Sequence, residues 1–285
     1  MIDDPENVEK LKVNCGSVNT FKDHVKVILI YFKALPSLKE SHHESYRAWV
    51  DAMAIEKKRV VKESRSNAPS NLRQSANWVT MDEWREALGK LRKEKDPHAT
   101  LKSSMTLVWV NYVCAIPTKR SDFGAMRIFE AEPSEADCTA HPNHLVLGIS
   151  EPRMEIGEFK TSKNRDPIVE VLPPDLLKTI KDSIEAHPRQ YLFENTKGQP
   201  FTRECFSTWT LNRSRELHDG KEAGANLIRH AFITCDVDFN KTALAQLDNI
   251  AERMGHSPAQ QAIYKYVTMQ PNHEYLRSKV VVKKK

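Results

Sequence analysis

Apolar residues recur at helical spacing near the start of the chain, in the stretch TFKDHVKVILIYFKAL (residues 20–35). Intervals of three and four residues between apolar positions predict an amphipathic helix. Thr20 is the expected N-cap of this helix and Pro36 its expected stop. Residues 44–61 repeat the pattern and run into the basic segment EKKRVVKESR. The N-terminal part is therefore predicted to be a small helical unit that carries cations along its length.

A polar stretch, SRSNAPSNLRQSAN (64–77), interrupts this periodicity. Pro and Ser without apolar periodicity are typical of a linker, so we expect one domain over residues 1–72 and a second over residues 73–285. Thr80 and Glu83 have the spacing of a capping box and predict the start of the next helix. The apolar run LKSSMTLVWVNYVCAI (101–116) is long enough for a buried helix.

Strand-like alternation and turn residues follow in three segments: HLVLGIS (144–150), RMEIGEFKTSKNRDPIVEVLP (153–173) and YLFENTKGQPF (191–201). Within the second, EFKTSKNRDPIVEV predicts a hairpin with the polar turn TSKNRD. Helical spacing then returns in CFSTWTLNRSREL, NLIRHAFITCDVD, TALAQLDNIAERMGH and PAQQAIYKYV. The expected fold class is mainly α with a small antiparallel β-sheet, an α+β architecture.

Composition narrows the function classes only slightly. The chain is 40% apolar and 28% charged, which is typical of a soluble globular protein. A net charge of +5 permits a nucleic-acid partner without requiring one. The five cysteines are scattered without a CxxC pair, which argues against a disulfide framework or a cysteine-rich zinc site. No apolar leader or membrane-length run occurs, so we expect a soluble intracellular protein with no membrane association, in the nucleus if the source is eukaryotic.

Few polar residues stand out when each is considered alone. Arg229 lies between apolar residues in NLIRHAFIT, and a buried charge is costly unless it has a partner. Arg120 follows the predicted buried helix and Lys160 lies in the predicted hairpin, where cations are usually structural or solvated. His256 ends a helix in MGHS, and Tyr264 lies on an apolar stripe, where most tyrosines are core residues.

Taken in order, these residues resemble the tyrosine recombinase (phage integrase) family, and the resemblance covers nearly the whole chain. The matching residues are Arg120 in IPTKRSDFGAM, Lys160 in FKTSKNR, Arg229 in NLIRHAFIT, Gly255–His256 in MGHS and Tyr264 in QQAIYKY. The phrases IPTKRSDF and NWVTMDEW are similar to the branch found in eukaryotic mobile elements and large DNA viruses. The resemblance implies a SAM-like helical DNA-binding domain over residues 1–72 and a catalytic domain with a C-terminal tail over residues 73–285.

The sequence departs from the family pattern at two positions. Asn226 occupies the first position of the His-x-x-Arg box. Its amide can donate a hydrogen bond to a phosphate but cannot hold a proton for transfer, so catalysis is expected to be weakened rather than abolished. Lys119 adjoins Arg120, which leaves the register open by one residue; the spacing to Asp122 favours Arg120.

Two tyrosines compete for the role of nucleophile. Tyr264 lies eight residues after His256, one short of the common bacterial spacing, and Tyr266 lies one beyond it. The viral-type pattern MGHS-x-x-x-Q-x-x-Y favours Tyr264, and Tyr266 remains the alternative.

The resemblance implies a division of roles. Arg120 and Arg229 would clamp the non-bridging phosphate oxygens, because guanidinium groups are planar, permanently charged and able to bind two oxygens. His256 would add a donor and accept the tyrosine proton. Lys160 would protonate the leaving 5′ oxygen, and Tyr264 would form a 3′-phosphotyrosine. No cofactor and no metal ion are expected.

The expected partner is double-stranded DNA, bound as a dimer on one site and a tetramer on two. Its phosphates would be contacted by Lys57, Lys58, Arg59, Lys62, Arg65 and Arg73. The tail RSKVVVKKK is either a piece that docks on a neighbouring subunit or a disordered basic end. The expected function is site-specific DNA recombination or integration. Three alternatives stay open: a recombinase-like protein that only binds DNA, a type IB topoisomerase-like enzyme that relaxes DNA, and an all-helical scaffold with accidental motif matches.

Overall fold

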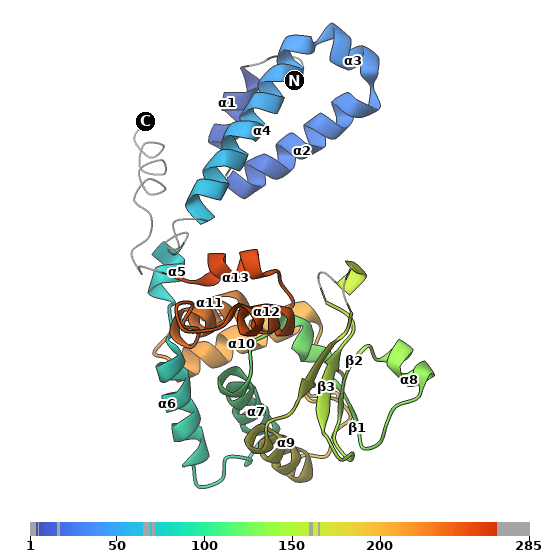
Figure 1. Ribbon diagram of the computed structural model, residues 1–285, viewed down its shortest axis with the longest axis vertical. Coiled ribbons are helices and arrows are strands. Elements are labelled where there is room, and N and C mark those ends of the chain that lie inside the picture. The colour runs from blue at the N-terminus through green and yellow to red at the C-terminus, as the bar shows by residue number, and fades with distance from the viewer. Residues whose placement is uncertain are drawn as a thin grey trace. The chain divides into compact units, whose positions relative to one another are not determined.

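The computed structural model describes residues 4, 6–15, 18–64, 69, 72–159, 162–164 and 166–266. These residues fall into two compact units, one formed by the described residues up to position 69 and one within Leu72–Val267 (Figure 1). Among the described residues, no helix is both long enough and apolar enough to cross a membrane.

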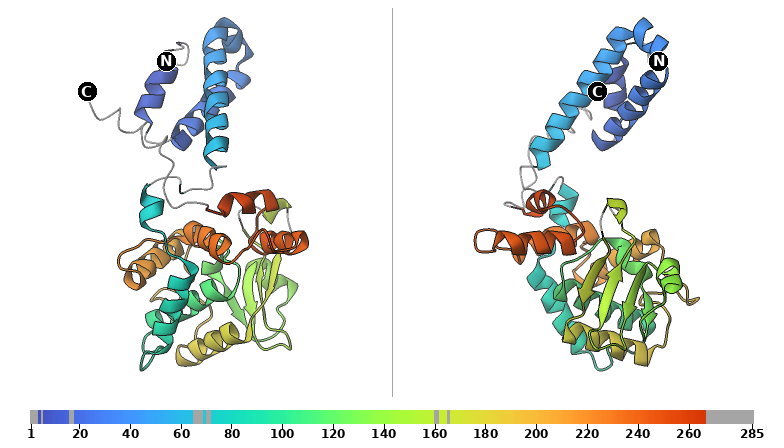
Figure 2. Two further views of the ribbon diagram at one scale, coloured as in Figure 1. Left: turned by 60° about the vertical axis from the view of Figure 1, so that its left-hand side comes forward. Right: turned by 45° about the vertical axis from the view of Figure 1, so that its right-hand side comes forward.

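The N-terminal unit is built from four helices: α1 (Asn7–Asn14), α2 (Val18–Ala34), α3 (Pro36–Ser41) and α4 (His43–Ser64). The two long helices, α2 and α4, lie side by side (Figures 1 and 2). Their apolar faces form one core that α1 completes. This core consists of Val8, Phe21, Val25, Phe32, Trp49 and Met53.

The predicted helices of this unit are confirmed, but one cap is not. Thr20 lies inside α2, where its carbonyl accepts a hydrogen bond from Nδ1 of His24 across 2.8 Å. The N-cap prediction for Thr20 is therefore wrong. Pro36 follows α2 as expected and also begins α3 at its first position, where proline is well suited because that N–H has no helical acceptor.

The second unit contains nine α-helices within the part of the chain that the structure describes, with one four-stranded sheet and two short 3₁₀ turns. In chain order they are α5 (Leu72–Ala76), α6 (Met81–Arg92), α7 (Leu101–Ala115), η1 (Ser121–Ala125), β1 (Arg127–Phe129), α8 (Glu135–Ala140), β2 (Asn143–Val146), β3 (Arg153–Ile156), η2 (Ser162–Asn164), β4 (Ile168–Val171), α9 (Pro174–Ala186), α10 (Arg203–Leu217), α11 (Ala225–Cys235), α12 (Leu244–Arg253) and α13 (Pro258–Tyr264).

The sheet has the strand order β1-β2-β3-β4; its strands are drawn as arrows in Figure 2. β2, β3 and β4 pair antiparallel, with Leu145 opposite Met154 and Ile156 opposite Ile168. β1 joins the sheet parallel to β2. The predicted fold class, mainly α with a small sheet, is confirmed, and the sheet is mixed because of β1. The hairpin from β3 to β4 is also present, whereas residues 191–201 form only two isolated bridges.

Local sequence explains how the helices around the later site begin and end. The predicted capping box at α6 is present: the Thr80 side chain accepts from the Glu83 amide, and Glu83 accepts from the Thr80 amide. α7 is buried along most of its length, as its apolar sequence predicts. Gly255 lies just beyond the C-cap of α12, and its φ of +66° is a left-handed conformation that favours glycine. Figure 1 shows α11, α12 and α13 gathered at one end of this unit.

The predicted linker, residues 64–77, overlaps the boundary between the units only in part. Its last part, Leu72–Ala76, is the helix α5 of the second unit. Residues 65–68 and 70–71 of that prediction lie outside the described residues, as does the predicted tail segment at 277–285.

Candidate active site

Helices α11 and α13 bring three of the expected site residues into contact. Asn226 and Arg229 lie in the first turns of α11, and Tyr264 is the last residue of α13. The Tyr264 hydroxyl donates a hydrogen bond to Oδ1 of Asn226 across 3.2 Å. Cζ of Arg229 lies 4.9 Å from the centroid of the Tyr264 ring, a cation–π distance. The phenol is thus held between an amide and a guanidinium.

Arg229 links this pair to the turn after α12. Its side chain is only 1% exposed, and its Nη2 donates to the Met254 carbonyl across 3.0 Å. The next residue, Gly255, has little room for a side chain, because a Cβ there would lie 3.3 Å from Cδ1 of Ile168. The buried guanidinium and the left-handed glycine therefore fix the backbone that leads to His256.

His256 is buried beside the tyrosine. Its ring centroid lies 5.2 Å from that of Tyr264. Its Nδ1 lies 3.1 Å from the Ser257 carbonyl, which is an acceptor only, so in the neutral ring the hydrogen resides on Nδ1. Nε2 then carries the lone pair, and the ring can accept a proton at that atom.

A small pocket beside Arg229 is lined by cations and apolar side chains. Lys119 and Arg120 line it together with Arg229, and the remaining walls are Ile156, Phe159, Ile168, Met254 and Gly255. Arg120 is half-buried, and its guanidinium has no ion pair or hydrogen bond among the described residues. Arg120 is thus available to an anion.

The neighbouring Lys119 is already engaged. Its Nζ lies 2.6 Å from Oε2 of Glu170, and both side chains are buried. Arg253 donates to the same carboxylate, with Nε 3.1 Å from Oε2. Burial lowers the pKa of the Lys119 ammonium to about 8, although Glu170 opposes the shift. Burial also raises the pKa of the Glu170 carboxyl, but Arg253 and Lys119 together outweigh it and hold that pKa below its usual value.

The balance of charge favours an anionic ligand. Lys119, Arg120, Arg229 and Arg253 are four cations, and Glu170 is one carboxylate, which leaves an excess of three positive charges around the pocket. Low-polarity walls strengthen the field of such a cluster. This surplus of positive charge favours an anion over a neutral or cationic ligand.

Sequence reasoning missed Glu170, Arg253 and His230. Glu170 carried a recognisable signal, because it alternates with exposed valines in IVEV and therefore occupies an inward position of a strand. Arg253 directly precedes MGHS, and His230 directly follows Arg229. His230 lies 2.7 Å from the Tyr264 carbonyl through its Nδ1, so it fixes the backbone of the tyrosine.

The two candidate tyrosines point to different partners. The Tyr264 hydroxyl is bonded to Asn226 beside Arg229, whereas the Tyr266 hydroxyl donates to Oε1 of Gln74 across 3.3 Å. Burial, and to a lesser degree the nearby Tyr264, raises the pKa of the Tyr266 phenol above its usual value. Tyr264 is the tyrosine next to the cationic pocket. Lys160 lies outside the described residues, on the segment that joins β3 to β4.

The residues expected to contact DNA lie in varied surroundings. Lys57 and Lys58 are exposed on α4. Arg59 lies 3.0 Å from the buried carboxylate of Glu56 through its Nε, so it has a structural role as well. Arg73 is exposed and forms an ion pair with Glu222 at 2.7 Å. The side chain of Lys62 and the whole of Arg65 lie outside the described part of the chain.

Within the described residues, no group of three or more His, Cys, Asp or Glu side chains is arranged to hold a metal ion. The positive charge of the site is supplied by side chains of the protein.

Comparison with known proteins gives a partial likeness of fold. No protein-family model matches the sequence, and no curated protein matches it. Several solved structures are similar, among them the following three. A crystal structure of XerA recombinase has a TM-score of 0.44 at 14% identity and covers 91% of this chain and 83% of that one. XerH site-specific recombinase bound to difH substrate, a pre-cleavage complex, has a TM-score of 0.45 at 14% identity, covering 91% and 70%. The post-cleavage complex of XerH with palindromic difH substrate has a TM-score of 0.45 at 13% identity. The match covers 98% of this chain and 76% of that one.

Proposed function

We propose that the protein is a DNA strand transferase that cleaves and rejoins DNA through a covalent bond between Tyr264 and a 3′-phosphate, as a site-specific recombinase or integrase does. The observation that carries the proposal is the contact of the Tyr264 phenol with Asn226 and Arg229, beside a pocket that Arg120 and Arg229 line. Site-specific recombination, rather than cleavage alone, rests on the sequence resemblance and belongs to the same proposal.

The reaction would proceed as a transesterification at phosphorus. The Tyr264 oxygen forms a bond to phosphorus, and the bond from phosphorus to the 5′ oxygen breaks. The phenolic proton passes to Nε2 of His256, since the amide of Asn226 cannot take it up. Lys160 supplies a proton to the leaving 5′ oxygen. A 5′-hydroxyl later attacks the phosphotyrosine and restores a diester, so the number of phosphoester bonds is conserved.

Charge stabilisation would come from the guanidinium groups. The transition state places extra negative charge on the non-bridging oxygens, and preorganised cations stabilise such charge without reorganising. Arg229 is held rigidly by burial and by the Met254 carbonyl. Arg120 enters the same pocket without a competing partner among the described residues. These two arginines are therefore assigned to the scissile phosphate.

The protein would bind DNA as a dimer on one recognition site and as a tetramer on two. Exposed Lys57 and Lys58 on α4 are suited to phosphate contacts, which make binding fall steeply with salt.

The test is capture of a covalent complex. Inverted or direct repeats are sought in the DNA that flanks the gene, and a duplex carrying them is synthesised with a 5′-bridging phosphorothiolate, whose sulfur leaves readily and does not re-attack. Wild-type protein is expected to give a DNA adduct on a denaturing gel, Tyr264→Phe is expected to give none, and Tyr191→Phe serves as a matched control away from the site. Tight binding without any adduct would point to a DNA-binding protein instead. Relaxation of plasmid lacking the repeats, by monomeric protein, would point to a topoisomerase-like enzyme.

A further inference from the structure

Tyr266 is anchored more firmly than a residue near the end of a short helix requires. Its ring stacks on His230 with centroids 4.3 Å apart and an interplanar angle of 20°. Its backbone N–H donates to Oγ1 of Thr234 across 2.9 Å. Its hydroxyl donates to Gln74, and the Trp78 ring lies 5.2 Å away. One side chain thus joins α11, α5 and the chain that follows α13.

His230 connects this anchor to Tyr264. The last carbonyls of a helix lack partners within the helix, and the Tyr264 carbonyl is one of them. Nδ1 of His230 donates to that carbonyl across 2.7 Å. Burial lowers the pKa of His230 to about 4, so the ring is neutral at physiological pH and its one N–H is committed to Tyr264. The imidazole that stacks on Tyr266 therefore also caps Tyr264.

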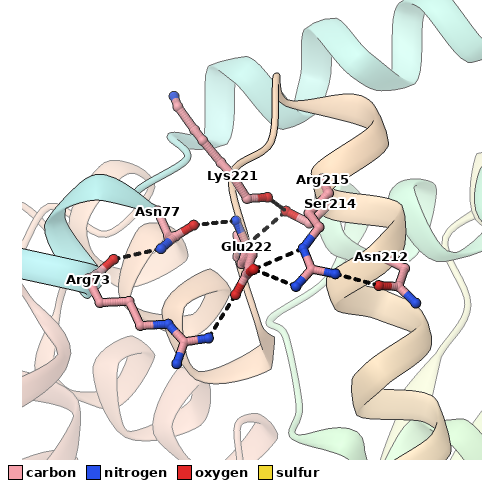
Figure 3. Close-up of polar contacts among 8 residues, drawn as sticks. Arg73, Asn77, Asn212, Ser214, Arg215, Lys221 and Glu222 are labelled. Atoms are coloured by element: carbon pink, nitrogen blue, oxygen red, sulfur yellow. Dashed lines mark hydrogen bonds and ion pairs between the residues drawn. The ribbon is translucent and has the colours of Figure 1, made fainter.

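Helix α5 has only five residues, but polar contacts on its other side hold it in place. Figure 3 shows Glu222 between Arg73 of α5 and Arg215 of α10. Nη2 of Arg73 lies 2.7 Å from Oε2 of Glu222, and Nε of Arg215 lies 2.9 Å from Oε1. Asn77 accepts a hydrogen bond from the Glu222 amide and donates to the Arg73 carbonyl across 2.8 Å. These contacts hold α5 in place, and with it Gln74, which accepts the hydrogen bond from the Tyr266 hydroxyl.

We propose that Tyr266 is a positioning residue that ties α5 and His230 to the segment carrying Tyr264, and so sets where the Tyr264 hydroxyl meets Asn226 and the phosphate. A single residue, Lys265, separates Tyr264 from Tyr266, and it is extended, so a displacement of one tyrosine is transmitted to the other. The proposal rests on the proposed function for its catalytic consequence. Its structural part, the immobilisation of residues 258–264 by Tyr266, stands apart from that function.

The test compares Tyr266→Phe and Tyr266→Leu with wild type, with Tyr191→Phe as the control. Tyr266→Phe keeps the stack and loses only the hydroxyl, whereas Tyr266→Leu loses both. Two quantities are measured: amide hydrogen exchange over residues 258–264 without DNA, and single-turnover adduct formation with the phosphorothiolate duplex.

Tyr266→Phe is expected to slow the single-turnover rate at saturating DNA about threefold to tenfold, the size of one lost neutral hydrogen bond. Tyr266→Leu is expected to slow it further and to speed exchange over residues 258–264, while the DNA concentration for half-saturation stays unchanged. If the Leu variant does not fold, the Phe variant carries the comparison.

The inference is overturned if both variants match wild type, or if exchange rises while the single-turnover rate does not change. It is also overturned if only the half-saturating DNA concentration moves. Failure of the proposed function is distinguishable, because wild type itself would then form no adduct; the exchange measurement would still decide whether Tyr266 immobilises residues 258–264.

Discussion

The Tyr264 hydroxyl donates its hydrogen bond to Oδ1 of Asn226, 3.2 Å away, and not to a group that can take up its proton. The amide oxygen orients the phenol, and the amide nitrogen remains on the same side chain to donate to a phosphate oxygen. A residue that departs from the family pattern in sequence therefore has a defined place beside the tyrosine. We assign to Asn226 the orientation of the phenol and to His256 the acceptance of the phenolic proton.

Two substitutions of Asn226 distinguish the loss of the hydrogen bond that orients the Tyr264 phenol from the addition of a negative charge beside the phosphate. Asn226→Ala is expected to lower the single-turnover adduct rate about threefold to tenfold, because one neutral hydrogen bond is lost. Asn226→Asp is expected to lower it more, since a carboxylate at this position repels the phosphate. An Ala variant with the wild-type rate, measured with the phosphorothiolate duplex, would mean that Asn226 does not orient the tyrosine.

The buried carboxylate of Glu170 is expected to matter more for stability than either cation it binds. Glu170→Gln leaves Lys119 and Arg253 without their anion, and breaking a buried ion pair in this way costs about 3–5 kcal/mol. Lys119→Met leaves Glu170 paired with Arg253 and is expected to cost less. The free energy of unfolding, measured by urea titration, gives both values. Equal losses for the two variants would show that the carboxylate does not hold the cluster together.

A double variant completes this comparison. Glu170→Leu combined with Lys119→Met replaces the buried Lys119–Glu170 pair by apolar side chains, a change that is often neutral or stabilising relative to the intact pair. Only Arg253, which is partly exposed, then lacks its anion. The double variant is expected to be more stable than Glu170→Gln alone.

Buried His230 predicts a loss of stability at acid pH. Its pKa is lowered from 6.5 to about 4 in the folded protein, chiefly by burial, with Arg229 adding to the shift. As the pH falls, His230 is therefore protonated near pH 6.5 in the unfolded chain but only near pH 4 in the folded protein. The contribution of neutral His230 to the free energy of unfolding is fully present above pH 6.5. It falls as the pH drops toward 4, by up to about 3 kcal/mol at 1.36 kcal/mol per pKa unit.

The measurement is the urea midpoint between pH 7 and pH 4 for wild type and for His230→Phe, which keeps a ring but cannot titrate. The Phe variant is expected to show a shallower pH dependence. An unchanged slope would assign the acid sensitivity to other groups.

Much of the architecture could be predicted from local sequence, because helical periodicity and capping boxes act over a few residues. The capping box of Thr80 and Glu83 and the buried helix at 101–116 are of this kind. Contacts across long sequence separations could not be predicted. Glu170 meets Arg253 83 residues later, and nothing local to either residue specifies its partner.

The candidate site shows the same division. Sequence indicated Arg229 and Tyr264 as residues of interest, and the folded chain brings them within a cation–π distance. The choices between Lys119 and Arg120, and between Tyr264 and Tyr266, involve residues one or two apart. The fold adds what no local pattern shows, that Lys119 is bound to Glu170 and Tyr266 to Gln74. Both choices remain part of the proposed function.

Exposed Lys57 and Lys58 predict a salt-dependent DNA affinity. Removing both charges by Lys57→Ala and Lys58→Ala is expected to weaken binding to any sequence and to reduce the slope of log affinity against log salt by about 2, at roughly 0.9 per phosphate contact. Arg59→Ala is the matched control, because Arg59 is already paired with Glu56 and its loss should change the slope less. Fluorescence anisotropy at several salt concentrations gives the slopes. Equal slopes in wild type and the double variant would remove these lysines from the DNA interface.

The central claim, that Tyr264 is the nucleophile, is tested most directly by locating the DNA adduct on the chain. Trypsin cleaves after Arg253, Lys265 and Arg277, so the two candidate tyrosines fall in different peptides, residues 254–265 and 266–277. Trapped complex is digested with nuclease and trypsin and analysed by mass spectrometry. The account predicts a residual nucleotide mass on Tyr264 in the first peptide. A nucleotide on Tyr266, or on any residue of the second peptide, would contradict it.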